Sequence, residues 1–198
     1  MSPPAPTLNR ILASARFESA TLLRNGEQLL VSLVLPAMAL VILAMSSYPE
    51  LGQPRIEVVT PGVIALAVVS TAFTGQAIAT AFDRRYGVLR LLGVSPLGRD
   101  GLLGGKAIAV LTVLAVPSVV LGAVAAGLGW RPGPVDLALL LVTVVIGAAC
   151  FVSLALLLAG VLRAEAVLAL ANLLWIIFLG LGLLLPVDTL PAAAQPIA

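Results

Sequence analysis

Side chains that commonly carry catalysis or bind metals are scarce in this chain of 198 residues. There is no histidine, and Cys150 is the single cysteine, so we expect neither a disulfide within the chain nor a zinc site. Cys150 lies in an apolar run, where a free cysteine usually serves as a small packing residue. No pair of carboxylates within the apolar stretches indicates an active site. The sequence therefore predicts no metal-binding or catalytic residue.

One glycine-rich stretch, residues 101–106, superficially resembles a nucleotide-binding loop. The spacing of that motif requires a glycine at position 100 and a hydroxyl at position 107. The chain has Asp100 and Ala107 instead. We therefore expect no ATP site here, and ATP hydrolysis would have to come from another protein.

The most informative charged stretch is residues 83–106, where basic and apolar side chains alternate. Its first basic residues, Arg84 and Arg85, precede a short amphipathic pattern that contains Arg90 and ends at Ser95-Pro96. The apolar members of this pattern are Val88, Leu89, Leu91 and Leu92. They need a cover, which could be lipid, the ends of neighbouring helices or a soluble partner. The residues alone leave open whether this is a docking element or only a basic loop.

The composition indicates a membrane protein. Hydrophobic residues make up 61% of the chain, charged residues 10%, and the mean hydropathy is +1.15. Soluble chains carry about 25% charged residues. The net charge of +2 gives no reason to expect a nucleic-acid partner.

Five uncharged stretches are long enough to cross a bilayer, for which about 20 residues suffice. They are residues 28–49, 58–82, 107–130, 137–162 and 166–187. Lipid requires each backbone polar group to be bonded within its own element, and these continuous runs favour helices over a barrel. The sequence predicts an all-α integral membrane protein, with residues 1–198 forming one transmembrane domain.

The distribution of basic residues predicts the orientation. With the N-terminus in the cytoplasm, nine basic residues lie inside and two outside, and the positive-inside rule favours this arrangement. The nine are Arg10, Arg16, Arg24, Arg84, Arg85, Arg90, Arg99, Lys106 and Arg163, and the two are Arg55 and Arg131. A multi-pass protein of the plasma membrane is expected.

The N-terminal stretch 7–25 has the pattern of a helix that lies in the membrane interface. Its polar character separates it from a cleaved signal peptide. Arg10 and Arg24 fall opposite an apolar face, near the lipid headgroups, whereas Phe17 lies on the polar side and breaks the pattern. The apolar face consists of Leu8, Ile11, Leu12, Ala15, Ser19, Leu22 and Leu23. A partly ordered tail is the alternative.

Several motifs, in order, resemble the permease subunits of ABC-2 type exporters. Thr60-Pro61-Gly62 opens the second stretch as in many actinobacterial members, Arg24-Asn25-Gly26-Glu27 precedes the first, and Gly105-Lys106 opens the third. The motif that follows the second span in this family is matched by Arg84, Arg85, Gly87, Leu89, Leu92, Ser95, Pro96 and Leu97. The resemblance extends over nearly the whole chain.

The resemblance implies a type V exporter-like helical bundle, in which an N-terminal amphipathic helix precedes six spanning helices. It also implies that residues 83–99 form a cytoplasmic coupling segment that docks on a separate ABC ATPase. Two ATPases and a second permease, identical or related, would complete the transporter, with ATP and Mg²⁺ on the ATPases and no cofactor on this chain. The expected coupling residues are Arg84, Arg85, Tyr86, Gly87, Leu89, Arg90, Leu92, Ser95 and Pro96.

Five spans instead of six are a departure from the family. The tail 190–198 resembles the start of the segment that precedes the sixth span, so a truncated or incomplete chain is expected. Thr71, Thr74, Gln76 and Asn172 are polar residues within the spans and candidates for the translocation path, although such groups often form interhelical hydrogen bonds instead.

The implied function is ATP-driven export of a hydrophobic or amphipathic cargo, such as a drug or a lipid-like molecule. A secondary carrier or channel is one alternative, but such proteins usually have ionisable residues deep in the membrane, and none is evident here. A membrane scaffold without transport activity is the other alternative.

Overall fold

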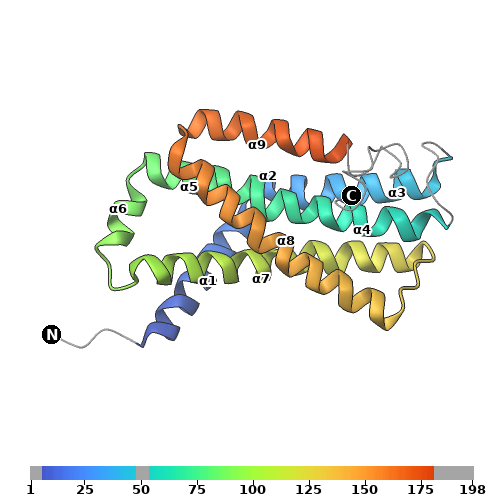
Figure 1. The fold of residues 1–198 in the computed structure, drawn as a ribbon, viewed down its shortest axis with the longest axis horizontal. Coiled ribbons are helices and arrows are strands. Elements are labelled where there is room, and N and C mark those ends of the chain that lie inside the picture. Colours follow the sequence, from blue (N-terminus) through green and yellow to red (C-terminus); the bar gives the residue numbers. More distant parts are fainter. Residues whose placement is uncertain (1–5, 48–53, 181–198) are drawn as a thin grey trace, which may run out of the picture.

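The computed structural model describes residues 6–47 and 54–180, and every regular element within these ranges is helical. Most of the helices run along the long axis of one elongated bundle (Figure 1). The prediction of an all-α protein is confirmed for this part of the chain. In chain order the elements are α1 (Thr7–Arg24), α2 (Gly26–Leu29), η1 (Leu30–Val34), α3 (Leu35–Met45), α4 (Arg55–Val68), η2 (Val69–Gly75), α5 (Gln76–Arg85), α6 (Val88–Gly93), α7 (Gly98–Gly127), α8 (Pro134–Val161) and α9 (Ala164–Leu179).

Three of the described helices are long and apolar enough to cross a membrane: Arg55–Arg85, Gly101–Gly127 and Pro134–Val161. The first combines α4, η2 and α5 into one continuous helix of 31 residues. Two further helices, Leu30–Met45 and Ala164–Leu179, are apolar but shorter. The predicted spans that contain them, 28–49 and 166–187, extend into residues outside the described ranges, as does the tail 190–198. The number of spans therefore stays a prediction.

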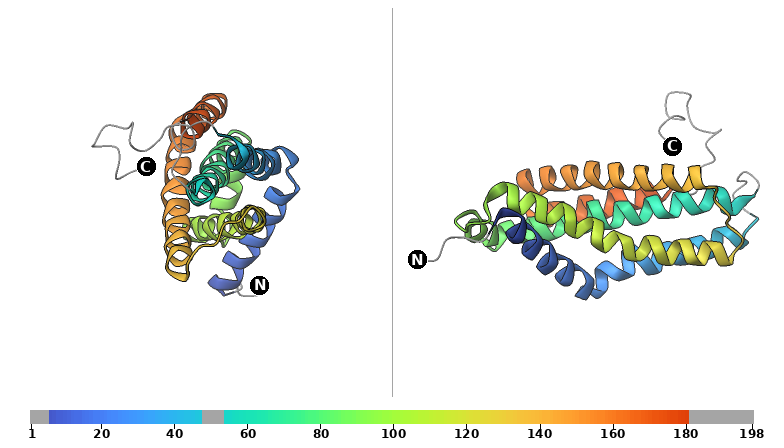
Figure 2. Two further views of the ribbon diagram at one scale, coloured as in Figure 1. Left: turned by 90° about the vertical axis from the view of Figure 1, so that its right-hand side faces the viewer. Right: turned by 90° about the horizontal axis from the view of Figure 1, so that it is seen from below.

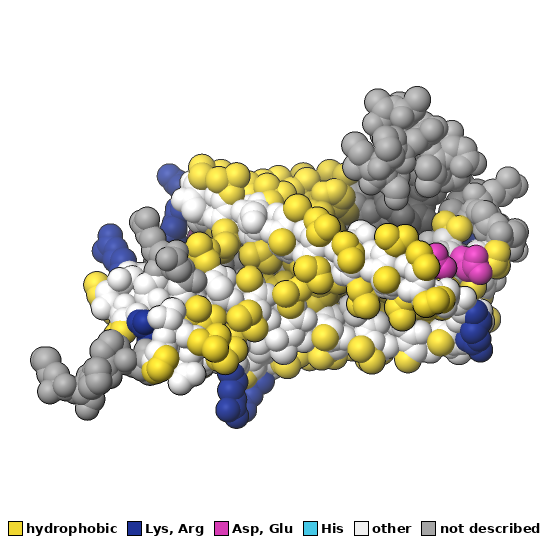
Figure 3. Space-filling view, turned by 60° about the horizontal axis from the view of Figure 1, so that its bottom comes forward, with side chains coloured by type: hydrophobic (Ala, Val, Ile, Leu, Met, Phe, Trp, Pro, Cys, Tyr) yellow, Lys and Arg dark blue, Asp and Glu magenta, His cyan; other side chains and the backbone are white. Residues whose placement is uncertain are grey.

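The continuous helix α4–η2–α5 forms the centre of the bundle. Viewed along the bundle, it is surrounded by α3, α7, α8 and α9 (Figure 2). Of its most apolar window, 72% is buried inside the protein, against 11% for α8. Hydrophobic side chains spread over the flank of the bundle, and charged ones lie mainly toward its ends (Figure 3). Such a large exposed apolar surface suits a lipid environment.

Small residues set the spacing between the helices on one side of this centre. Ala77 and Ala81 of α5 pack against Ala155 and Ala159 of α8, and Ala171 of α9 joins the same cluster. Helices that meet through small side chains can approach closely and gain dispersion energy that lipid does not supply.

Two π-helical segments contact each other: η1, which lies between α2 and α3, and η2, which lies between α4 and α5 in the central helix. The wider turn shifts the i→i+4 pattern, and such segments are frequent at functional sites. The Gln28 amide Nε2 donates a hydrogen bond of 3.1 Å to the backbone oxygen of Ser70 in η2. The side chain of Gln28 thus connects α2 to the middle of the central helix.

The predicted connection between the second and third spans is mostly helical. It consists of the end of α5, the short helix α6, and the first turns of α7, which begins at Gly98 and not at residue 107. Charges and glycines suggested a loop, but α1 packs along the start of α7 and supplies tertiary contacts that stabilise a helix there.

Candidate functional site

Helix α6 is a short segment whose direction is fixed at both ends by glycine. Gly87 has φ +77° and separates α5 from α6, and Gly98 has φ +69° at the start of α7. This left-handed backbone strains residues that have a Cβ atom. The Ser95 hydroxyl donates to the Leu92 oxygen at 2.6 Å and accepts from the Leu97 backbone nitrogen at 3.3 Å, so it ends α6.

The two faces of α6 have different environments. Val88, Leu89 and Leu92 are half-buried, and α6 contacts α5 and α7. By contrast, Tyr86 and Leu91 are each 71% exposed and Val94 is 86% exposed. We call these three exposed side chains the α6 tip. Leu89 and Leu92, which the sequence predicted as coupling residues, therefore lie on the packed side of α6. Leu91 and Val94, which were not among the predicted coupling residues, face outward.

Arg84, at the end of α5, contacts the end of α8. Its Nη1 donates to the backbone oxygens of Ala159, at 2.8 Å, and Gly160, and its Nη2 donates to the oxygen of Leu162 at 3.2 Å. Carbonyls in the last turn of a helix lack partners inside the helix and carry its negative dipole end. The guanidinium group thus caps α8 and holds it to the base of α6.

The two other arginines of this segment differ from Arg84. Arg85 forms an exposed ion pair with Glu165 in the first turn of α9, and its guanidinium carbon lies 6.0 Å from the ring centres of both Phe82 and Tyr86. Arg90 is exposed and makes no side-chain hydrogen bond or ion pair with the described residues. Of the three cations predicted to meet a partner, Arg90 is the one whose guanidinium group forms no hydrogen bond or ion pair inside the described part of the chain.

Lys106 of α7 is a buried cation that the sequence analysis named as a basic residue at the start of the third span but not as a candidate site residue. Its residue is 1% exposed, and its ammonium nitrogen lies 2.5 Å from Glu18 Oε1 on α1 and 3.7 Å from Asp83 Oδ2 on α5. A single lysine at the start of an otherwise uncharged span was the available signal. Its two partners lie far away in the sequence, so only the packing of α1 and α5 reveals the cluster.

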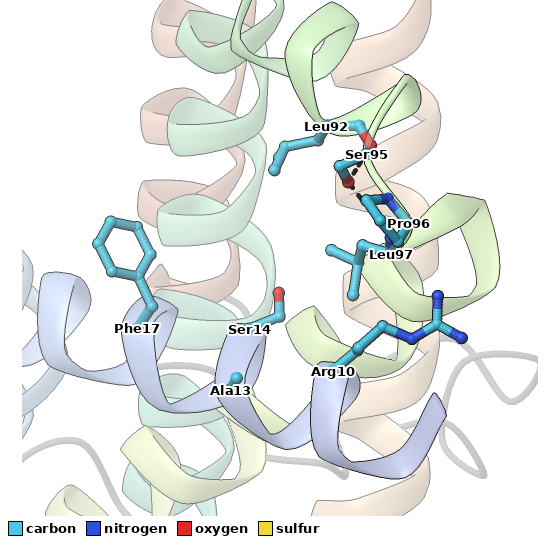
Figure 4. Close-up of a pocket in the computed structure, with 8 residues that line it drawn as sticks. All are labelled: Arg10, Ala13, Ser14, Phe17, Leu92, Ser95, Pro96 and Leu97. Carbon is cyan, nitrogen blue, oxygen red and sulfur yellow. Dashed lines mark hydrogen bonds between the residues drawn. The ribbon is translucent and has the colours of Figure 1, made fainter. Parts of the chain in front are cut away.

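A shallow groove of about 420 Å³ separates α1 from the turn between α6 and α7 (Figure 4). The Phe17 ring and the Leu92 side chain stand on its two sides, and Phe17 is 76% exposed. The Nε atom of Arg10 is buried here without a hydrogen-bond partner in the described residues. The groove is lined by Arg10, Ala13, Ser14, Phe17, Leu92, Ser95, Pro96 and Leu97.

The four candidates for the translocation path do not share one surface. Thr71, Thr74 and Gln76 lie inside the bundle, with exposed fractions of 1%, 5% and 0%. Their side-chain polar atoms have no hydrogen-bond partner in the described part of the chain, and the same is true of buried Thr80. Asn172 instead lies on the exposed side of α9. Whether cargo reaches any of them stays a prediction.

This helical bundle, in which the short helix α6 lies between two glycines of positive φ, can now be compared with known families. The family model described as ABC-2 type transporter matches residues 9–198. The chain belongs to the ABC-2 type transporter family. Neither curated proteins nor solved structures gave a match. As an ABC-2 protein it is the membrane-spanning permease of an ABC transporter, and permeases of this family work with an ABC ATPase.

Proposed function

We propose that this permease exports a hydrophobic or amphipathic cargo, such as a drug or a lipid-like molecule, and that its ATPase docks on the α6 tip. The observation that carries the docking surface is the exposure of Tyr86 just before α6, Leu91 within it and Val94 just after it, while Val88, Leu89 and Leu92 of the same helix are half-buried. Exposed apolar side chains beside Arg90, whose side chain has no ion-pair partner among the described residues, suit a partner surface with an apolar pocket and an acidic rim.

The contacts around α6 support a lever mechanism. The central helix Arg55–Arg85 runs continuously to the base of α6, and Arg84 joins that base to the end of α8. A displacement of α6 would therefore move the central helix and α8 together, rather than only bend a loop. In this proposal α6 lies in the cytoplasm of a bacterial cell, the ATP and Mg²⁺ sites belong to two ATPase subunits, and a second permease completes the path.

The polar residues of the central helix would take part only after a rearrangement. Thr71, Thr74 and Gln76 are enclosed in this conformation, whereas Asn172 already faces outward on α9. Since η2 contains Thr71 and Thr74 and Gln76 follows it, a change of this π-helical segment would alter their exposure. We propose that Asn172 contacts cargo or the second permease first, and that the buried residues become accessible during transport.

A docking experiment tests the proposal. The chain is co-expressed with its ATPase, and complex formation is measured by pull-down in detergent for the native chain, Leu91→Asp and Val135→Asp. Leu91 is 71% exposed and Val135 is 68% exposed at the start of α8, at the opposite end of the bundle (Figure 1). We expect Leu91→Asp to abolish the complex and Val135→Asp to preserve it. Equal binding by the native chain and Leu91→Asp would refute docking on the α6 tip.

Transport is measured separately in vesicles that contain the complex. ATP-dependent movement of an amphipathic dye toward the side opposite α6 supports export. Movement that an ion gradient drives without ATP would instead favour the carrier alternative, because an ABC permease is driven by ATP and not by an ion gradient.

A further inference from the structure

We infer that Lys106 is a positioning residue that makes α1 move together with the base of α6 during the transport cycle. This inference rests on the proposed docking at the α6 tip. It assigns to α1 a part in transmission, in addition to its predicted place in the membrane interface.

The geometry joins three elements at one atom. The Lys106 nitrogen on α7 lies 2.5 Å from the Glu18 carboxylate of α1 and 3.7 Å from the Asp83 carboxylate of α5. The lysine side chain is 2% exposed, that of Glu18 is 16% exposed, and that of Asp83 is 37% exposed. Water thus has little access to the cation, and its charge is balanced by these carboxylates.

The position of this cluster relative to α6 matters for transmission. Asp83 precedes α6 in the chain and Lys106 follows it, so their contact joins the two ends of the segment that contains the lever. Helix α6 itself buries none of its residues fully. Its motion must therefore pass through its two ends, and Glu18 connects α1 to that same point.

Close packing lets α1 reach this point. A Cβ atom on Gly105 would lie 2.7 Å from the Ser14 hydroxyl oxygen and 3.0 Å from the Ser14 Cβ, so a larger residue here would require Ser14 to shift. Ala15, Ser19 and Leu22 of α1 are buried, whereas Leu8 and Leu12 remain exposed. Helix α1 is therefore joined to α7 by packing and by an ion pair rather than held by lipid alone.

The stability of variants can distinguish a positioning role of the Lys106 ion cluster from a purely stabilising role. A buried ion pair often contributes little net stability compared with neutral side chains of similar size, but removing one partner leaves an uncompensated charge and is strongly destabilising. Neutralising all three groups should therefore preserve folding. If the ion cluster serves only the fold, such a variant will function normally; if the cluster transmits motion, the variant will fold but fail to couple.

Three variants of the full permease, each co-expressed with its ATPase, test this. They are Lys106→Met alone, the neutral triple variant Glu18→Gln, Asp83→Asn, Lys106→Met, and the charge-swapped variant Glu18→Lys, Asp83→Asn, Lys106→Glu. For each we measure thermal unfolding in detergent, ATPase binding by pull-down, and dye transported per ATP hydrolysed in vesicles.

We expect Lys106→Met to be unstable, because two carboxylates then lack their cation. The neutral triple variant should fold and bind the ATPase as the native chain does, yet its transport per ATP should fall roughly tenfold, a typical size for coupling between sites. The charge-swapped variant should recover coupling, since the ion pair between α1 and α7 is restored in reverse.

Native coupling in the neutral triple variant would overturn the inference, and so would a folded charge-swapped variant that stays uncoupled. If the native chain does not bind the ATPase at all, that result would instead contradict the proposed docking. The two failures are therefore distinguishable.

Discussion

The indole nitrogen of Trp175 on α9 donates a hydrogen bond of 2.6 Å to the hydroxyl of Ser70 in the π-helical segment η2. The same hydroxyl donates to the Leu66 backbone oxygen at 2.8 Å, and the Ser70 backbone oxygen accepts from Gln28. Three helices therefore meet at one serine in the middle of the central helix. Because η2 has an irregular turn, these contacts determine which conformation it keeps.

Trp175→Phe should lower the free energy of unfolding by about 1 kcal/mol, since it removes one neutral hydrogen bond while retaining an aromatic ring. The measurement is the thermal midpoint in detergent. Because Ser70→Ala removes the same contact, the double variant should lose clearly less than the sum of the single losses. Additive losses would show that this hydrogen bond contributes no coupling.

Replacing Arg84 and Arg85 should have unequal effects. Arg84→Gln removes charge-assisted hydrogen bonds to the end of α8 and should cost about 1–2 kcal/mol. Arg85→Gln removes a pair whose side chains are 51% and 64% exposed, and should cost less than about 1 kcal/mol. Thermal unfolding of both variants checks this, and a larger loss for Arg85→Gln would contradict the assignment of Arg84 as the cap.

Two glycines of α7 should respond in opposite directions to alanine. Gly105→Ala places a methyl group against Ser14 of α1 and should destabilise the protein by about 1–3 kcal/mol. Gly122→Ala meets nothing within 4 Å and should stabilise the helix by about 0.5–1 kcal/mol. Thermal unfolding distinguishes them. If Gly105→Ala is neutral, α1 does not pack as closely on α7 as the structure shows.

Alanine at Gly87 should redirect α6. At φ +77° an alanine costs about 1–2 kcal/mol, so the backbone will relax and move the α6 tip. ATPase binding by pull-down should fall more for Gly87→Ala than for Gly93→Ala, because Gly93 is not among the glycines with positive φ and a methyl group there meets nothing within 4 Å. Equal binding of the ATPase by the two variants would show that the Gly87 backbone does not position α6.

Gln76→Met should raise the stability of the isolated permease. Both polar atoms of the Gln76 side chain are buried without a partner in the described residues, and an unsatisfied buried polar group costs about 1–3 kcal/mol. Methionine has a similar volume and avoids this cost. If Gln76 takes part in transport, the stabilised variant will also transport less. A lower thermal midpoint would mean that the amide has partners in the folded protein.

The sequence by itself determined the class of the protein, and it predicted a coupling segment at residues 83–99. Runs of about 20 apolar residues without charge leave few alternatives to helices in lipid, because every backbone polar group must be bonded locally. The start of α6 after Gly87 and its end at Ser95-Pro96 also depend on local chemistry. A left-handed backbone and a proline affect only a few neighbouring residues.

Only the tertiary structure decided the roles of the individual side chains. Arg84 and Arg90 look alike in the sequence, but Arg84 meets the end of α8 some 75 residues away, whereas the Arg90 side chain forms no hydrogen bond or ion pair with a described residue. The charge cluster of Lys106 depends likewise on Glu18, which is 88 residues distant. Hydrophobic periodicity shows that a helix has a buried face, but it does not show which helix covers that face. Pairings between distant polar groups depend on how the helices pack, and one sequence pattern is compatible with several packings.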